Sequence, residues 1–210
     1  MLTTRAVYQR FWGAAAFTSG VLYLWLSVPV KTHGALLWEQ QLAAEVTGWQ
    51  RPWLDSLMVA IAWIGQAAVM VPAAVAVAFV NRRRWADFAW FGAFIVAVSP
   101  LIGEVLRWWV GRSRPSGAGN GFPSNQTFLA TIVLGLAVVV VWGPVASTLV
   151  RAGVLLLGAA VVCAVAVSRV YLDLDWPADV VGGVLAGATY LSTGMWVLGR
   201  VRPRTWHGNG

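Results

Sequence analysis

Six apolar segments, each about long enough to cross a lipid bilayer, dominate this 210-residue chain. They run approximately over residues 11–30, 54–80, 88–106, 128–146, 149–167 and 180–199. A hydrocarbon core about 30 Å thick is crossed by about 20 apolar helical residues, and a backbone in lipid must satisfy its own hydrogen bonds. The first segment is long for a cleaved signal peptide, so we count it as a span. We therefore predict an all-α bundle of six transmembrane helices, forming one membrane domain over residues 1–210.

The charged residues orient the predicted bundle. They make up 11% of the chain, whereas soluble domains carry about a quarter, so the net charge of +7 is better explained by a bilayer than by nucleic acid. Six spans place both termini on one side. By the positive-inside rule, that side is cytoplasmic, because the termini and the second and fourth connections carry nine of the 15 basic residues: Arg5, Arg10, Arg82, Arg83, Arg84, Arg151, Arg200, Arg202 and Arg204. We expect a multi-pass protein of the inner (plasma) membrane.

Two smaller patterns predict local structure. Residues 35–46, in the first outer connection, alternate apolar side chains with polar ones that include Glu39 and Glu45. This pattern favours a short interfacial helix, although an unstructured loop fits the composition equally well. Gly183 and Gly187 in the last span form a GxxxG pattern, which is typical of closely packed helices.

Three polar stretches lie where the spans meet the predicted outer surface, and the first carries three arginines. Arg107, Arg112 and Arg114 follow one another within eight residues. Each guanidinium offers a planar fork of donors that suits phosphate oxygens, and three of them exceed what the anchoring of one helix end requires. We predict an anion-binding role for this stretch. Glu104 lies one turn before Arg107, and we expect the two to pair.

The other two stretches begin the fourth and sixth spans. In residues 121–127, a helix N-terminus offers free N–H groups to an anion and Ser124 adds a hydroxyl; alternatively, Ser124 or Asn125 merely caps the helix. In residues 168–179, Pro177 marks a helix start. If that helix begins early, Asp175 and Asp179 share one of its faces; otherwise these carboxylates are ordinary caps near a helix start.

Together the three stretches resemble the type 2 phosphatidic acid phosphatase superfamily. The family signature is a basic residue, six spacers and Arg-Pro; then Pro-Ser-Gly-His or Pro-Ser-Asn-His; then Ser-Arg, five spacers, His, three spacers and Asp. The resemblance covers about residues 52–199 and implies that this chain contacts a lipid or polyprenyl phosphate. The matching residues are Arg107 with Arg114-Pro115, then Pro123-Ser124-Asn125-Gln126, then Ser168-Arg169 with Asp175 and Asp179. By resemblance, the phosphate is held by Arg107, Arg114, Ser124 and Arg169.

Both catalytic histidines of the family are replaced in this chain. The resemblance implies a general acid where Gln126 stands, a nucleophile where Asp175 stands, and an orienting role for Asp179. Glutamine has no proton to give near neutral pH. A carboxylate that attacks phosphate meets an anion, and enzymes that use one generally add a metal. The two histidines of the chain, His33 and His207, match neither motif position.

Three hypotheses about function follow. In the first, the protein binds a lipid or polyprenyl (di)phosphate at the outer face, needs no cofactor, and has lost or strongly altered catalysis. In the second, it is an active phosphatase or phosphotransferase that uses Asp175 or a metal-bound water, with magnesium held by Asp173, Asp175 and Asp179. In the third, it transports a lipid carrier or serves as an accessory subunit. No oligomeric state is predicted.

Pairing of Asp175 distinguishes among these hypotheses. Two carboxylates one helical turn apart disfavour double ionisation unless a cation lies between them. If Asp175 pairs with a cation of the chain, the nearest candidates are Arg169, Arg107 and Arg114. Such pairing would weaken phosphate binding, and a fully paired site without room for phosphate would favour a purely structural role.

Overall fold

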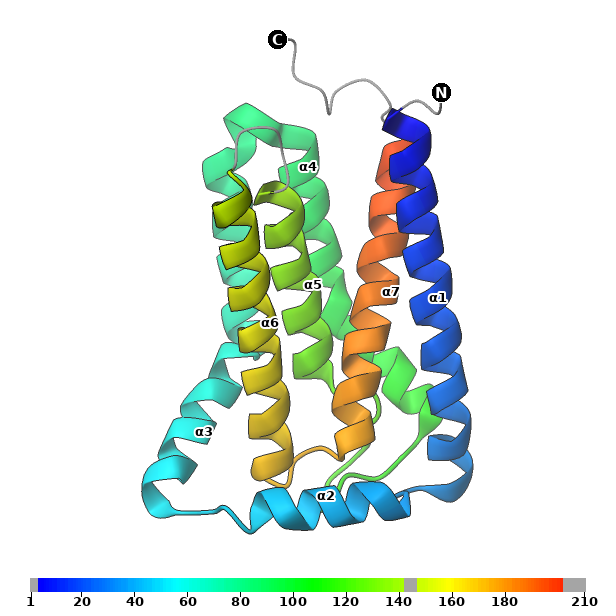
Figure 1. Cartoon of the computed structure of the whole chain (residues 1–210), viewed down its shortest axis with the longest axis vertical. Coiled ribbons are helices and arrows are strands. Elements are labelled where there is room, and N and C mark those ends of the chain that lie inside the picture. The colour runs from blue at the N-terminus through cyan, green and yellow to red at the C-terminus, as the bar shows by residue number, and fades with distance from the viewer. Residues whose placement is uncertain (1–3, 142–146, 202–210) are drawn as a thin grey trace.

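The computed structural model is entirely helical over the residues it describes. These are residues 4–141 and 147–201, without the side chains of residues 4, 5, 80–87 and 141. They form seven helices, and most of them run along the long axis of the molecule while one lies across an end (Figure 1). The helices are α1 (Thr4–His33), α2 (Leu37–Thr47), α3 (Pro52–Ile64), α4 (Ala67–Val110), α5 (Asn125–Val141), α6 (Thr148–Tyr171) and α7 (Pro177–Val201). The predicted all-α class is confirmed.

Four helical stretches are long and apolar enough to cross a membrane: Ala6–His33, Phe88–Val110, Thr148–Tyr171 and Pro177–Val201. They contain the first, third, fifth and sixth predicted spans. The second predicted span, residues 54–80, is not continuous, because Pro52–Ile64 and Ala67–Phe79 meet at a bend of 46°. The break lies at Gly65, where an added Cβ would stand 2.9 Å from Val165 of α6. A residue without a side chain therefore lets the chain approach α6 closely there.

The count of six crossings stays a prediction. With the bent pair taken as one span, the described residues supply five candidates, and α5 is a shorter apolar helix. The remaining predicted span, residues 128–146, ends at positions 142–146, outside the described residues. Figure 1 shows the start of α1 and the end of α7 at the same end of the bundle, as an even number of crossings requires.

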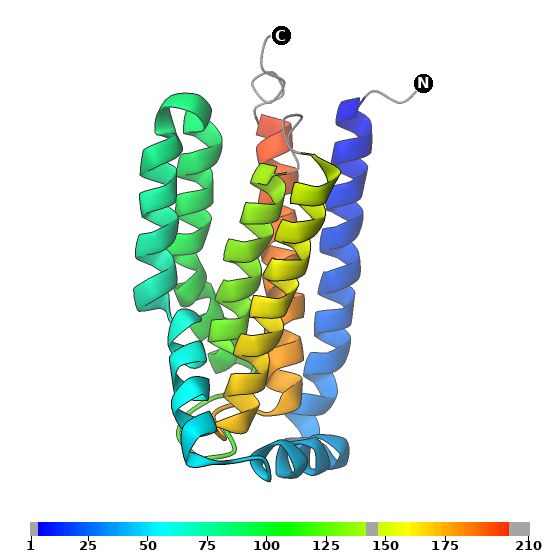
Figure 2. The same ribbon diagram turned by 60° about the vertical axis from the view of Figure 1, so that its left-hand side comes forward.

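Helix α4 folds back on itself. Figure 2 shows its two arms, Ala67–Phe79 and Phe88–Val110, running side by side, and buried Ala78, Ala89 and Ala93 form a small cluster. Small side chains allow the two arms to approach each other. As a result, the end of α4, which carries Arg107, lies at the same end of the bundle as α2 (Figures 1 and 2).

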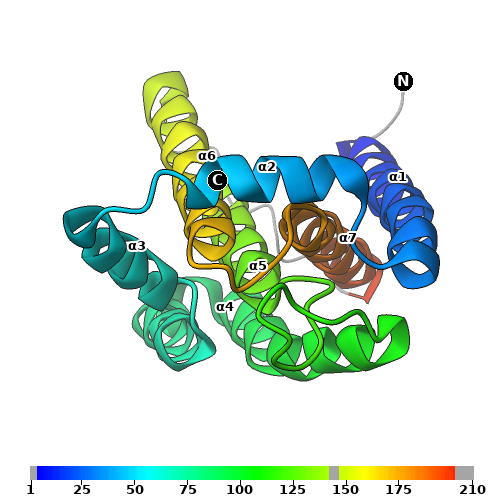
Figure 3. The same ribbon diagram turned by 90° about the horizontal axis from the view of Figure 1, so that it is seen from below.

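The helix predicted in the first outer connection is confirmed as α2. Seen from below, α2 lies across the ends of α6 and α7 (Figure 3). Its buried face consists of Glu39, Ala43 and Val46, at the i, i+4, i+7 spacing of one helical face. The sequence pattern placed Glu39 among the polar positions between the apolar ones, yet this side chain is completely buried.

Close packing of α5 against α7 places the second motif beside the third. A Cβ added at Gly183 would lie 2.7 Å from the carbonyl oxygen of Ser124, and one added at Gly187 would lie 2.8 Å from that of Phe128. The two glycines therefore mediate close helix packing, as the GxxxG pattern predicts. The backbone N–H of Ser124 also donates to the carbonyl oxygen of Asp179 at 2.8 Å.

A polar contact fastens the start of α3 to the end of α6. The buried Tyr171 hydroxyl donates to Asp55 Oδ1 at 2.6 Å and accepts the backbone N–H of Arg51 at 3.0 Å. The side chain of Gln50 donates to the backbone oxygen of Tyr171 at 2.9 Å. These bonds hold the chain between α2 and α3 against the segment that leads into the third motif.

Candidate functional site

The three motifs meet at the α2 end of the bundle. Arg107 stands in the last turn of α4, which ends at Gly111 in the left-handed conformation (φ 70°), and glycine adopts this conformation without steric cost. Ser124 directly precedes α5, Arg169 stands in the last turn of α6, and Asp175 lies in the turn before α7. Segments that are far apart in sequence are therefore brought together by helix ends.

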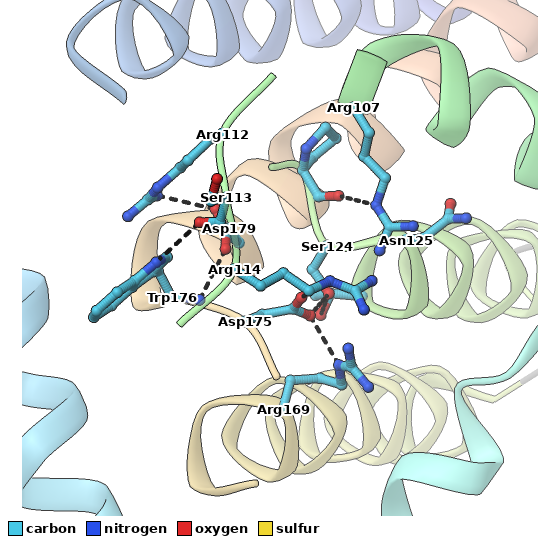
Figure 4. Close-up of polar contacts among 12 residues, drawn as sticks. Arg107, Arg112, Ser113, Arg114, Ser124, Asn125, Arg169, Asp175, Trp176 and Asp179 are labelled. Atoms are coloured by element: carbon cyan, nitrogen blue, oxygen red, sulfur yellow. Dashed lines mark hydrogen bonds and ion pairs between the residues drawn. The ribbon is translucent and has the colours of Figure 1, made fainter. Parts of the chain in front are cut away.

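Asp175 lies at the centre of this arrangement and is 1% exposed. Its Oδ2 accepts hydrogen bonds from Ser124 Oγ at 2.7 Å and from Arg169 Nε at 2.8 Å. Its Oδ1 lies 3.8 Å from Arg114 Nε. Figure 4 shows these side chains converging on the carboxylate. Of the alternatives that the sequence left open for Asp175, the structure has it paired with an arginine, Arg169.

Arg107 joins the same group from the other side. Its Nη1 donates to Glu104 Oε1 at 2.7 Å, as the i, i+3 spacing predicts, and its Nε donates to the Pro123 carbonyl at 3.3 Å. In Figure 4 its guanidinium lies beside that of Arg114. The four residues matched to the family's phosphate-holding positions thus lie together, and we call Arg107, Arg114, Ser124 and Arg169 the cradle.

The cradle concentrates positive charge in a partly buried place. Burial lowers the pKa of the Arg114 guanidinium below its ordinary value, and the neighbouring cations Arg107 and Arg169 lower it further, whereas Asp175 raises it. An arginine remains protonated despite such a shift. Burial and the neighbouring cations thus disfavour the charge of Arg114, and the nearby carboxylate of Asp175 partly offsets this effect.

A second ion network lies beside the cradle, and it was not expected. Arg112 Nη1 donates to Asp179 Oδ1 at 2.9 Å, and Arg112 Nη2 donates to both carboxylate oxygens of Glu39 at 2.9 and 3.0 Å. The Arg112 and Glu39 side chains are 1% and 0% exposed, and Asp179 is also fully buried. Arg112 is therefore bound to two carboxylates and does not join the cradle with Arg107 and Arg114.

Glu39 and Asp179 occupy equivalent places in their helices. Each is the third residue of its helix, and each accepts the backbone N–H of the residue before that helix: Leu36 for Glu39 and Trp176 for Asp179, both at 2.8 Å. This is the carboxylate half of a capping box. Glu39 also accepts the N–H of Ala178, in the first turn of α7, at 2.9 Å. The starts of α2 and α7 are therefore joined both directly, by this bond, and through Arg112.

Asp175 and Asp179 do not share a helical face. Helix α7 begins at Pro177, as the proline predicts, so Asp175 stands in the turn before it. Asp173 is exposed, and Asp175 and Asp179 pair with different arginines. Within the described part of the chain no three acidic, histidine or cysteine side chains are grouped as metal ligands. Asp173, Asp175 and Asp179, which would hold magnesium under the second hypothesis, are thus not grouped as ligands in this structure.

Gln126 and Ser124 also differ in part from expectation. Gln126 packs against Gly65, with its Cβ 3.2 Å from an added Cβ there, and its Oε1 is buried without a hydrogen-bond partner among the described residues. Ser124 donates its hydroxyl to Asp175 and therefore does not act as a simple helix cap. The sequence signal that could have found Glu39 was its position near the start of the helix predicted over residues 35–46, because capping carboxylates are common near helix starts.

Comparison with known proteins gives one similar curated sequence. No protein-family model matches the chain. Phosphatidylglycerophosphatase B of Bacillus subtilis (strain 168) is 24% identical to it over 177 residues, which is 80% of this chain and 86% of that protein. The match therefore extends over most of both proteins.

Two solved structures have a similar fold. The crystal structure of a transmembrane PAP2 type phosphatidylglycerolphosphate phosphatase from Bacillus subtilis superposes with a TM-score of 0.79 at 20% identity, covering 90% of this chain and 98% of that one. The crystal structure of LpxE from Aquifex aeolicus gives a TM-score of 0.60 at 15% identity, covering 77% and 97%. These folds show that the chain has the fold of PAP2 type membrane phosphatases. Together with the similar sequence, they support the resemblance of its three motifs to the type 2 phosphatidic acid phosphatase (PAP2) superfamily.

Proposed function

We propose that this protein binds the phosphate of a lipid phosphate or polyprenyl (di)phosphate in its cradle, and that it does not hydrolyse it by the family's histidine route. The observation that supports this most directly is the convergence of Ser124, Arg114 and Arg169 on one buried carboxylate. Charge-assisted donors that hold a carboxylate oxygen at 2.7 to 2.8 Å also suit a phosphate oxygen. The named activity of the similar Bacillus protein, on a lipid phosphate, supports the same ligand class.

The proposed location is the outer face of the inner membrane. The cradle lies at the α2 end, opposite the start of α1 and the end of α7 (Figure 1). The positive-inside rule favours a cytoplasmic location for those helix ends, and this supports an outward-facing cradle. A head group would then be reached from the outer leaflet, near the surface where α2 lies.

The loss of histidine chemistry follows from the residues at the two reacting positions. Gln126 has an amide and cannot protonate a leaving alkoxide near neutral pH. The Asp175 carboxylate already accepts one hydrogen bond from the Ser124 hydroxyl and one from the Arg169 guanidinium. Without an acid for the leaving group and with a paired carboxylate as the nucleophile, the barrier to phosphate release stays high.

The test uses purified protein and a panel of lipid phosphates, including phosphatidic acid and a polyprenyl diphosphate, with and without magnesium. We expect binding without phosphate release by the wild-type protein. The double variant Gln126→His with Asp175→His should gain phosphate release, because it restores both family histidines on an intact cradle. A matched control, Gln40→His with Asp173→His, makes the same substitutions at exposed positions and should stay inactive. Rapid metal-independent release by the wild-type protein would contradict the proposal.

A second candidate function is favoured by one specific contact. Asp175 Oδ1 is buried and has no hydrogen-bond partner among the described side chains, so it retains a lone pair for attack. It would bond to phosphorus while the bond from phosphorus to the lipid oxygen breaks, and the leaving oxygen would take a proton from water. The hydroxide left from that water would then cleave the aspartyl phosphate, releasing inorganic phosphate and restoring the carboxylate.

This alternative makes a separate prediction. Acid-quenched protein should carry a phosphate on Asp175, visible as a mass shift on the peptide that contains it, and Asp175→Asn should abolish both the label and turnover. Asp173→Asn, at an exposed site two residues away, should keep both. Turnover that survives Asp175→Asn would rule out the carboxylate as nucleophile.

A further inference from the structure

We propose, on the basis of the proposed function, that Asp175 is an intramolecular competitor of the lipid phosphate and must leave the cradle when a head group binds. Its carboxylate contacts Ser124 and Arg169 and lies near Arg114. These are three of the four groups that the family resemblance assigns to the phosphate. The carboxylate therefore stands where the ligand would stand.

Ser124 can donate a hydrogen bond either to Asp175 or to a phosphate, but not to both. A serine hydroxyl has one proton to donate, and here it is donated to Asp175 Oδ2 at 2.7 Å. Thr127 Oγ1 in turn donates to Ser124 Oγ at 3.1 Å, so the hydroxyl is oriented from behind. A phosphate oxygen receives the Ser124 proton only after Asp175 has released it. The same holds for the single N–H of Arg169 Nε.

The net charge of the cradle also favours exchange of Asp175 for a phosphate. Three cradle guanidiniums face two carboxylates, those of Asp175 and Glu104, which leaves one excess positive charge. When Asp175 withdraws, two positive charges are uncompensated. A phosphate monoester carries about two negative charges near neutral pH, so the cradle without Asp175 matches it and the cradle with Asp175 does not.

The exchange that we propose is a rotation of the Asp175 side chain on a fixed backbone. Asp175 lies in the turn between α6 and α7, where the backbone N–H groups of Leu174 and Asp175 donate to the Arg169 carbonyl at 3.0 and 3.3 Å. The backbone of the turn is thus fixed to the end of α6. Only one carboxylate oxygen of Asp175 is hydrogen-bonded, whereas Oδ1 has no hydrogen-bond partner in the described region and lies 3.8 Å from Arg114 Nε. Rotation of the side chain therefore breaks two hydrogen bonds.

The experiment measures binding of short-chain phosphatidic acid to purified protein in detergent by titration calorimetry. Asp175→Asn removes the competing charge and should bind the lipid about tenfold more tightly than wild type, which corresponds to about 1.4 kcal/mol. Asp173→Asn makes the same charge change on an exposed side chain and should bind as wild type does. Phosphatidylcholine of the same chain length tests whether the gain depends on the phosphate monoester.

The outcomes separate this inference from the proposed function. If wild type binds phosphatidic acid and Asp175→Asn binds equally or more weakly, the competition is disproved while lipid-phosphate binding stands. If neither protein binds, both proposals fail and the paired cradle is structural. Asp175→Ser, measured in parallel, should also bind more tightly, and it keeps the test decisive if the asparagine variant does not fold. Monodisperse elution and an unchanged helical circular dichroism spectrum are required of each variant.

Discussion

Replacing Glu39 with glutamine should destabilise the protein far more than the same change at Glu45, although both residues lie on α2. Glu39 is completely buried, and its carboxylate accepts hydrogen bonds from Arg112 Nη2 and from the backbone N–H groups of Leu36 and Ala178. Glu45 is exposed. The two substitutions are chemically identical, so they differ only in what the side chain contacts.

The expected magnitude follows from those contacts. Removing one partner of a buried ion pair costs about 3–5 kcal/mol. Arg112 keeps Asp179 as a counter-ion at 2.9 Å, so Glu39→Gln should lower the free energy of unfolding by about 3 kcal/mol, the lower end of that range. Arg112→Gln leaves two buried carboxylates without a cation and should cost about 5 kcal/mol. A substitution at an exposed position, such as Glu45→Gln, changes the free energy of unfolding by about 0.5 kcal/mol or less.

Unfolding in mixed detergent micelles, followed by circular dichroism, gives the free energy of each variant. The order of destabilisation should be Arg112→Gln, then Glu39→Gln, then Glu45→Gln. The reasoning is refuted if Glu39→Gln and Glu45→Gln are equally stable, or if loss of Arg112 is tolerated better than loss of Glu39.

Three further substitutions test packing and capping by the same unfolding measurement. Gly183→Ala should lower the free energy of unfolding by about 1–3 kcal/mol, because the added methyl would lie 2.7 Å from a carbonyl oxygen of the second motif. Gly153→Ala, with no atom within 4 Å of the added methyl, should leave that free energy unchanged or raise it. Equal effects of the two substitutions would exclude close packing as the cause. Tyr171→Phe should cost about 1–3 kcal/mol, since it leaves Asp55 Oδ1 without its 2.6 Å donor, and an unchanged stability would show that water replaces the hydroxyl. Ser147→Ala should lower the free energy of unfolding by about 1 kcal/mol, because the serine side chain caps α6. An unchanged free energy of unfolding would mean that this cap is dispensable.

The fold class could be predicted because it depends on local signals, and the meeting of the motifs because their order and spacing resemble those of a known family. Long apolar segments form helices wherever they lie in a membrane protein, and Pro177 marks the start of α7 as its fixed φ predicts. The i, i+3 pair of Glu104 and Arg107 needs only helical geometry. The break at Gly65 was missed, because hydropathy does not report the close approach of α6 that shapes it.

The site was harder to predict where partners come from distant segments. Arg112 looked equivalent to Arg107 and Arg114 in the sequence, and the structure separates it by pairing it with Glu39, 73 residues away. No local pattern specifies such a pair. Likewise, the common face suggested for Asp175 and Asp179 depended on where α7 begins. Helix α7 begins after Asp175, and the two carboxylates pair with different arginines.

The hydrogen bond from Ala178 to Glu39 also constrains the order in which the protein can be assembled. Its two residues are 139 positions apart, and the donor belongs to the last helix of the described chain. During synthesis α2 emerges early but lacks this partner until α7 has been made and inserted. The packing of α2 across the end of the bundle is therefore completed late, and a nascent chain stopped before α7 should leave α2 open to protease.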